Sequence, residues 1–208
     1  MSDYLSEEEQ LSRLYNWWKQ NGAAVIVGLV LAIAGVLGWR WYQSYEQERV
    51  TAASDLYVEF LAANGAARDT LAKDIVAGGD ATAYPVLVLL RQAQAAVAAG
   101  DLAGAEKPLS EAVEAASGAV LADLARVRLA RVQHGLGRHD DALATLGQVR
   151  APGYLPLAQE LKGDIHMARD ERAQAHEAYV AALGEVLADD QRALLEIKVA
   201  DTADASDS

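Results

Sequence analysis

Four histidines are the side chains of this sequence that could do chemistry, because the chain contains no cysteine. His134, His139, His166 and His176 could bind a metal ion or transfer protons near neutral pH. Their spacing supports neither role, since no HExxH motif occurs and no spacing of histidine and carboxylate matches a known metal motif. We therefore interpret all four as surface or groove histidines, and we expect no metal site.

Other catalytic patterns are also missing from the sequence. No glycine-rich loop follows a strand, and no G-x-S-x-G motif occurs. Carboxylates are abundant but are spread along what we expect to be solvated faces. The sequence thus predicts a protein that is not an enzyme and that needs no cofactor. A membrane-bound enzyme that uses His166 and nearby carboxylates is the catalytic alternative.

The composition favours helices as the elements that position these residues. Of 208 residues, 52% are apolar. Alanine dominates this fraction, and alanine loses no side-chain entropy on entering a helix. No convincing strand signal appears. The net charge of −12 would repel a phosphate backbone, so nucleic acid is not an expected partner.

Three stretches of the sequence repeat one pattern of turn and helix. Each has a turn residue, an alanine five positions later, and a bulky residue four positions beyond the alanine. The turns recur 37 and then 33 residues apart, close to the tetratricopeptide period of about 34. We expect a left-handed helix end at the turn, touching helices at the alanine, and a filled seam at the bulky residue. The sets are Gly100, Ala105 and Leu109; Gly137, Ala142 and Leu146; and Asp170, Ala175 and Tyr179.

The repeats predict an all-α fold with a tetratricopeptide-like solenoid of helical hairpins, and an unrelated helical bundle is the alternative. We expect a degenerate unit over residues 44–78 and a capping helix over residues 190–199. A solenoid binds partners on the concave face formed by the first helix of each hairpin. In this register, the candidate binding residues are Gln94, Val97, Val127, Arg131, His134, Glu160, Asp164 and Met167.

An apolar run near the N-terminus predicts one transmembrane helix. Residues 23–39 carry no charged or strongly polar side chain. A helix from Trp18 to Trp39 is about 31 Å long, and the hydrocarbon core of a bilayer is about 30 Å thick. Tryptophan prefers the two membrane interfaces, and all four tryptophans fall at these levels. They are Trp17, Trp18, Trp39 and Trp41.

Two other readings of this run remain open. Ala32-Ile33-Ala34 matches the small-residue pattern of a cleaved signal peptide, but the leader is acidic rather than basic. A buried core helix would not need tryptophans at both ends. Orientation is undecided by charge, because Arg13 and Lys19 precede the run and Arg40 and Arg49 follow it.

Small residues share one face of the predicted span, where another helix could approach closely. They are Ala24, Gly28, Ala32 and Gly35. Before the span, Leu11, Leu14, Tyr15 and Trp18 form an apolar stripe typical of a short amphipathic helix at the interface. Asn21-Gly22 could form a turn between the two helices, and one continuous helix is the alternative.

The predicted organisation has four parts. Residues 1–21 form a leader with the short amphipathic helix, and residues 22–42 form the transmembrane anchor in membrane lipid. Residues 43–200 form the repeat domain. Residues 201–208 form an acidic tail, which we expect to be disordered.

These features together resemble the bacterial YfgM family. The resemblance rests on the acidic leader with WWKQNG, the span that ends in GWRWY, and the degenerate repeats. It implies an inner-membrane protein with a cytoplasmic N-terminus and periplasmic repeats. It also implies association with the Sec translocon and with the membrane-anchored periplasmic chaperone PpiD, and a role in helping unfolded, newly exported proteins. It carries over no catalytic residue.

Two alternative functions share much of this organisation. One is an adaptor whose repeats face the cytoplasm and recruit a soluble partner to the membrane. The other is a scaffold for envelope assembly, with a topology similar to that of the membrane-anchored periplasmic chaperone or translocon accessory protein that the resemblance implies.

Overall fold

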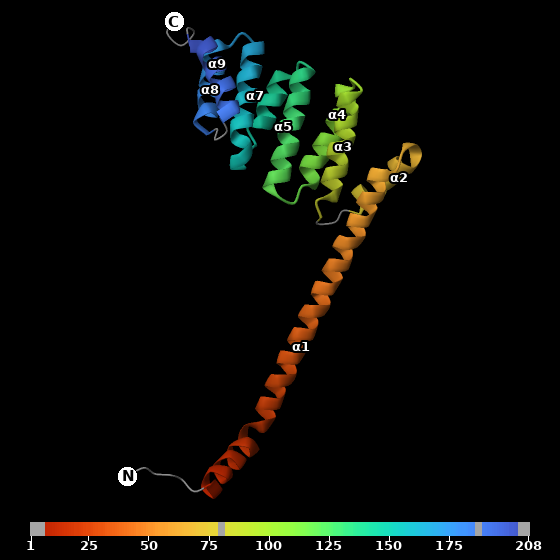
Figure 1. Ribbon diagram of the computed structural model, residues 1–208, viewed down its shortest axis with the longest axis vertical. Coiled ribbons are helices and arrows are strands. Elements are labelled where there is room, and N and C mark those ends of the chain that lie inside the picture. The colour runs from red at the N-terminus through yellow and green to blue at the C-terminus, as the bar shows by residue number, and fades with distance from the viewer. Residues whose placement is uncertain (1–6, 79–81, 186–188, 204–208) are drawn as a thin grey trace, which may run out of the picture. The chain divides into compact units, whose positions relative to one another are not determined.

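The computed structural model describes residues 7–78, 82–185 and 189–203, and these residues form helices without any strand (Figure 1). The all-α fold with one long apolar helix at the N-terminus, which the sequence predicts, is confirmed. The chain divides into two compact units, Met1–Ala52 and Ala53–Ser208.

The first unit is the greater part of one helix, α1 (Glu7–Ala62). The helix continues through Asn21 and Gly22, so the turn predicted there is wrong and the alternative of a continuous helix is confirmed. The Asn21 side-chain amide donates a hydrogen bond to the Trp17 carbonyl oxygen at 3.0 Å, within the helix. The Trp18 indole lies over Gly22, where a Cβ atom would stand only 3.1 Å from the ring. The missing side chain of Gly22 therefore leaves room for the Trp18 ring to pack on the helix, and the glycine does not break the helix.

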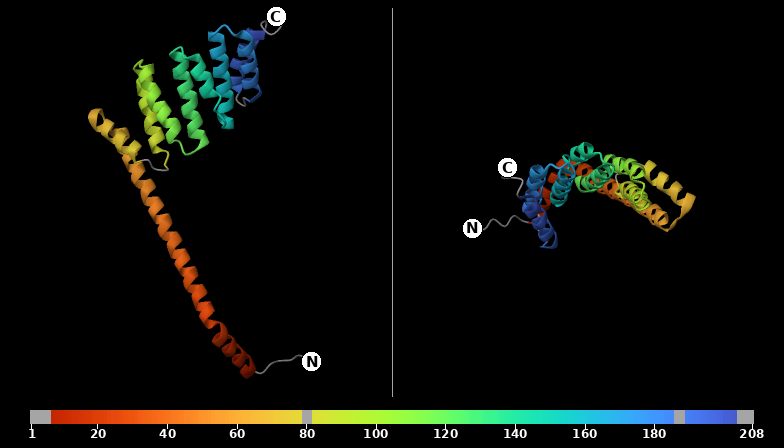
Figure 2. Two further views of the ribbon diagram at one scale, coloured as in Figure 1. Left: turned by 180° about the vertical axis from the view of Figure 1, so that it is seen from behind. Right: turned by 90° about the horizontal axis from the view of Figure 1, so that it is seen from above.

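The part of the second unit that the structure describes contains the end of α1 and nine further helical elements. Three helical hairpins follow one another in chain order and form a curved row (Figure 2). The elements are α2 (Gly65–Ala77), α3 (Tyr84–Ala98), α4 (Leu102–Ala115), α5 (Ala119–Gly135), α6 (His139–Leu146), the 3-10 turn η1 (Pro152–Tyr154), α7 (Leu155–Ala168), α8 (Arg172–Glu185) and α9 (Asp189–Thr202). Asp201 and Thr202, placed in the tail by the sequence, belong to α9, and residues 204–208 of that tail lie outside the described residues.

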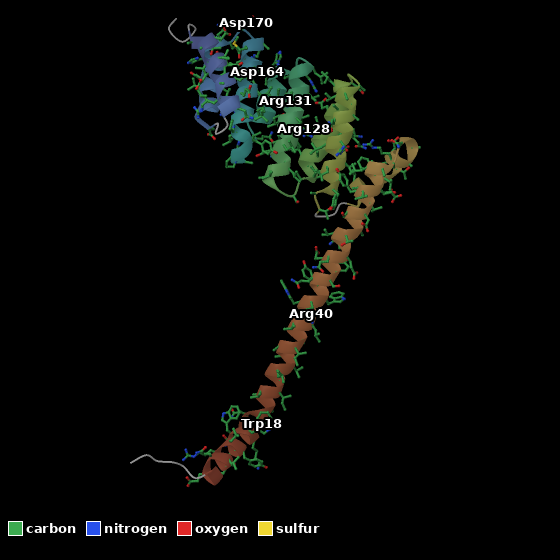
Figure 3. The ribbon with its side chains drawn as sticks, viewed as in Figure 1. Trp18, Arg40, Arg128, Arg131, Asp164 and Asp170 are labelled. Atoms are coloured by element: carbon green, nitrogen blue, oxygen red, sulfur yellow. The ribbon has the colours of Figure 1, made fainter. Side chains whose placement is uncertain are left out.

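The three hairpin turns share one backbone geometry. Gly100, Gly137 and Asp170 have φ angles of 78°, 76° and 61°, which is the left-handed conformation expected at these positions. In each turn, the N–H of the next residue donates a hydrogen bond to the carbonyl oxygen five residues earlier, at 2.9 Å. This is the Schellman arrangement of a helix end. Asp170, labelled in Figure 3, is the one non-glycine residue in the described chain with a positive φ.

The residues that follow each turn pack as the repeat pattern predicts. Ala105, Ala142 and Ala175 are all completely buried, so their small side chains let the two helices of each hairpin touch. Leu109, Leu146 and Tyr179 are buried beside them. Tyr179 packs so closely on Gly163 that a Cβ atom there would overlap the ring.

The core of the second unit is a series of apolar clusters rather than one centre. The first joins Phe60 of α1 to Ala72 and Ile75 of α2 and to Val88 of α3. Three further clusters lie along α3–α5, α5–α7 and α7–α9. Each hairpin therefore buries its apolar face mainly against its neighbours in the row, as expected for a solenoid.

A buried carboxylate ties the irregular segment after α6 to α5. Asp123 Oδ2 accepts hydrogen bonds from the backbone N–H groups of Arg150 and Ala151 at 2.8 and 2.6 Å. Its Oδ1 accepts from the Arg126 guanidinium at 2.6 Å. Burial acts to raise the pKa of Asp123, but the bonds from Ala151, Arg150 and Arg126 outweigh it and lower the pKa. The ionised form is thus the one that the fold stabilises.

Alanine at Gly100 or Gly137 is expected to lower the free energy of unfolding by about 1 kcal/mol, because the left-handed conformation strains any residue with a Cβ atom. Gly184→Ala is the matched control. Gly184 lies inside α8 with open space at its Cβ position, so this change is expected to stabilise the protein slightly. Thermal unfolding of the full chain in detergent micelles, followed by circular dichroism, measures each change. Equal effects at all three positions would contradict the turn geometry.

Asp123→Ala is expected to lower the free energy of unfolding by about 2 kcal/mol at neutral pH, because buried donors lose their acceptor. The pKa of Asp123 is lowered in the folded state. Its contribution is therefore complete above the unfolded value of about 3.9 and is lost as the pH falls through the folded pKa. Unfolding at neutral and acidic pH checks both statements, with Asp69→Ala on the exposed surface of α2 as control. A loss no larger than that of the control would refute the role of Asp123.

Candidate functional site

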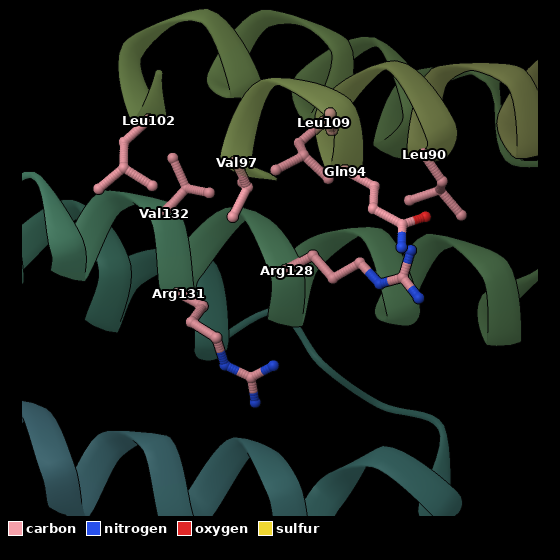
Figure 4. Close-up of a pocket in the computed structure, with 9 residues that line it drawn as sticks. Leu90, Gln94, Val97, Leu102, Leu109, Arg128, Arg131 and Val132 are labelled. Carbon is pink, nitrogen blue, oxygen red and sulfur yellow. The ribbon is translucent and has the colours of Figure 1, made fainter. Parts of the chain in front are cut away.

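A groove lies in the second unit between the first helices of two successive hairpins, α3 and α5 (Figure 4). Its volume is about 250 Å³. Apolar side chains form its floor, and Leu90, Leu109 and Val132 among them are also part of the buried cluster of α3–α5. The groove is therefore built on the repeat core and does not depend on a loop.

Three polar side chains border this apolar floor. Gln94 comes from α3, and Arg128 and Arg131 come from α5. Figure 4 shows the Gln94 amide beside the Arg128 guanidinium. Both arginines are exposed, and neither pairs with a carboxylate in the part of the chain that the structure describes. The arginines before and after them in the sequence do have carboxylate partners, since Arg126 binds Asp123 and Arg138 binds Glu106.

The groove brings together three residues of the predicted concave face. Gln94, Val97 and Arg131 all line it. Val127 was wrongly assigned to this face, because it is 1% exposed and packs in the cluster of α5–α7. Arg128, the next residue, lies in the groove and was missed. Its spacing of three residues from Arg131 could have found it, because residues three apart share a helix face.

The rest of the predicted face has partners within the protein. Lys198 of α9 donates hydrogen bonds to Glu160 Oε1 at 2.7 Å and to Asp164 Oδ1 at 2.8 Å. Asp164 also accepts a hydrogen bond from the Tyr179 hydroxyl at 2.8 Å. Met167 packs against the cluster of α7–α9. Helix α9 therefore covers the acidic end of the predicted concave face, which the sequence analysis expects to be accessible to a partner.

This cluster shifts two proton equilibria. Burial and the hydrogen bond to Asp164 raise the pKa of the Tyr179 hydroxyl, which stays protonated. Burial acts to lower the pKa of Lys198, but its bonds to Asp164 and Glu160 outweigh burial and raise the pKa. Lys198 is therefore a permanent cation within this contact, and the cluster has a structural role.

His134 and His139 lie side by side where α5 ends and α6 begins. Their Nδ1 atoms are 3.1 Å apart, so one ring donates a hydrogen bond to the other. Burial lowers the pKa of His134, the charge on His139 lowers it further, and Asp164 opposes both. Among the described residues, no group of three or more side chains could hold a metal ion.

The other two histidines contact side chains of the same region. His166 Nδ1 lies 2.6 Å from Glu171 Oε2, across the α7–α8 turn. His176 Nδ1 lies 3.1 Å from Thr202 Oγ1 of α9. The first contact joins α7 to the turn before α8, and the second joins α8 to α9.

Helix α1 contains the candidate membrane segment. Among the described residues, it is the one helix long and apolar enough to cross a membrane. Its four tryptophans are at least half exposed, and Trp18 and Arg40, labelled in Figure 3, lie near the two ends of the apolar run. Gly28 and Gly35, two residues of the predicted packing face, have open space at their Cβ positions. The apolar stripe of Leu11, Leu14 and Tyr15 is also exposed.

The repeated hairpins and the groove between their first helices define a tetratricopeptide-like repeat protein, a class built for binding other proteins. A family model of the tetratricopeptide repeat-like domain matches residues 15–204. The long apolar helix near the N-terminus fits a membrane-anchored member of this class.

Comparison with characterised proteins identifies the family within this class. The chain is 33% identical to the ancillary SecYEG translocon subunit of Haemophilus influenzae, over 88% of this chain and 91% of that protein. The proteins of the same name from Aggregatibacter actinomycetemcomitans and Escherichia coli are 31% and 27% identical, each over 88% of this chain and over 91% and 90% of their own length. The chain belongs to this family of ancillary translocon subunits, the YfgM family. No solved structure matches the chain at a significant level.

Proposed function

We propose that this protein is an accessory subunit of the Sec translocon that binds newly exported proteins, or a partner chaperone of the PpiD kind, through its repeat domain. The observation that carries this proposal is the groove between α3 and α5, which leaves apolar and polar side chains open to a partner. The names of the relatives support the association with the translocon, because the similarity extends over both the apolar helix and the repeats.

The proposal includes a topology. Residues 22–42 cross the inner membrane, the N-terminal leader of residues 1–21 is cytoplasmic, and the repeat domain of residues 43–200 lies in the periplasm. The exposed tryptophans Trp17, Trp18, Trp39 and Trp41 support this span, because their indoles would lie at the two lipid interfaces. An adaptor with the opposite orientation would present the same groove to the cytoplasm.

A reporter that is active only outside the cytoplasm tests the orientation. Fused after Ser208, it is expected to be active, because the repeats would be translocated. The same reporter fused before Met1 is the control and is expected to be inactive. An inactive C-terminal fusion in a stably accumulated protein would support the cytoplasm-facing adaptor instead.

Photocrosslinking in whole cells tests the binding role. A photoreactive residue at Gln94, in the groove, is expected to capture exported proteins or a translocon-associated chaperone. The matched control is Lys107, whose side chain is 84% exposed on α4 and does not line the groove. Equal capture at both positions would argue against the groove, and capture of envelope-assembly components alone would favour the scaffold.

The same experiment addresses the span. We propose that Ala24, Gly28, Ala32 and Gly35 form a docking face for a membrane partner. A photoreactive residue at Ala32 is then expected to capture that partner. The same residue at Val30, on the opposite side of the helix, is not. Capture that does not distinguish the two positions would reduce this segment to an anchor.

A further inference from the structure

The charge on the groove is opposite in sign to that of the protein. The chain carries a net charge of −12, yet α3 contains no aspartate or glutamate. The one acidic residue of α5 is Asp123, which is buried and bonded to Arg126 and two backbone N–H groups. The two helices that face each other across the groove therefore offer no free carboxylate.

Two arginines supply positive charge on the same helix. Arg128 and Arg131 are both exposed, and the described residues hold no carboxylate that pairs with either. They lie three positions apart on α5, which separates them by about 4.5 Å along the helix axis. Arg126 and Arg138, by contrast, already have carboxylate partners. The groove thus combines an apolar floor with two cations that no carboxylate of the described residues neutralises.

The size of the groove selects the kind of ligand. Its volume of about 250 Å³ is below the range of about 300–1,000 Å³ typical of pockets that enclose small molecules. It lies between α3 and α5, and Leu102 and Leu109 of α4 add to the apolar side chains that line it. Such a surface suits a few side chains from an amphipathic helix, which lays its apolar face into a groove.

We propose that the groove between α3 and α5 binds an amphipathic segment of a partner protein that carries acidic residues one helical turn apart, beside its apolar face. The apolar side chains of the segment cover Leu90, Val97 and Val132, and its carboxylates meet Arg128 and Arg131. Figure 4 labels these five lining residues. Gln94 can donate or accept a hydrogen bond at the same edge. This selectivity rests on the proposed function, since it names the class of segment that the repeat surface recognises.

A matched set of peptides tests this selectivity. Three helix-forming peptides of about 15 residues, roughly four helical turns, share one apolar face. Beside that face they carry Glu, Gln or Lys at two positions four residues apart. Binding to the full chain in detergent micelles is measured by fluorescence anisotropy. We expect the acidic peptide to bind about tenfold more tightly than the glutamine peptide, which should bind more tightly than the lysine peptide.

Charge-neutralising variants locate the effect. Arg128→Gln with Arg131→Gln is expected to remove the preference for the acidic peptide, while the glutamine peptide keeps its affinity. Lys73→Gln with Lys107→Gln changes the net charge equally, on exposed side chains of α2 and α4, and should preserve the preference. Val97→Ser should weaken acidic and glutamine peptides alike, because it removes apolar contact without changing charge.

Several results would overturn the proposal. Equal binding of acidic and glutamine peptides would show an apolar groove without charge selectivity. An equal loss of preference in the lysine control pair would show an effect of net charge alone. Self-association of the chain that is abolished by the two arginine substitutions would make a second copy the occupant. If the peptides show no preference although Gln94 captures exported proteins in cells, the selectivity fails and the proposed function stands. If the acidic peptide is preferred although Gln94 captures no exported protein or chaperone in cells, the proposed function fails and the selectivity of the groove stands.

Discussion

The close contact between the two helices of each hairpin is the constraint on which the rest of the repeat domain depends. It requires a left-handed turn at Gly100, Gly137 or Asp170 and a completely buried alanine five residues later. Because this geometry recurs, the first helices of successive hairpins are neighbours, and their facing sides create a surface that no single hairpin could form. The groove is thus a consequence of repetition, and its shape depends on turns that lie outside it.

Electrostatics divides this repeated surface into two regions. At α7, the carboxylates of Glu160 and Asp164 form ion pairs with Lys198 of α9, so this negative charge has a partner within the domain. At α3 and α5, Arg128 and Arg131 have no carboxylate partner among the described residues, because the one carboxylate of these two helices, Asp123, is already bonded. Similar helices therefore pack together at one end of the row and leave the proposed binding surface nearer the other.

Local patterns were predictable from the sequence, and contacts between distant residues were not. The turn glycines, the buried alanines and the bulky residues follow from short spacings, and the structure has them where predicted. The sequence predicts Val127 on the concave face, but the neighbouring residue Arg128 lines the groove instead, so this prediction is wrong by one residue. Such an error arises easily on α5, because this helix buries side chains against neighbours on two sides. The capture of Glu160 by Lys198 joins residues 38 positions apart, and no local pattern indicates it. The turn predicted at Asn21-Gly22 is wrong for the opposite reason, because here a local pattern indicates a turn where the helix continues. The Trp18 ring packs on Gly22 within this helix.

The position of α9 has a consequence for valency. Helix α9 covers the acidic end of the face, and the groove between α3 and α5 is the binding surface that we propose for a partner helix. A receptor with one seat gains no avidity from a partner that carries several matching segments. The strength of that one contact would then set the residence time of the partner, unless a second contact is made elsewhere.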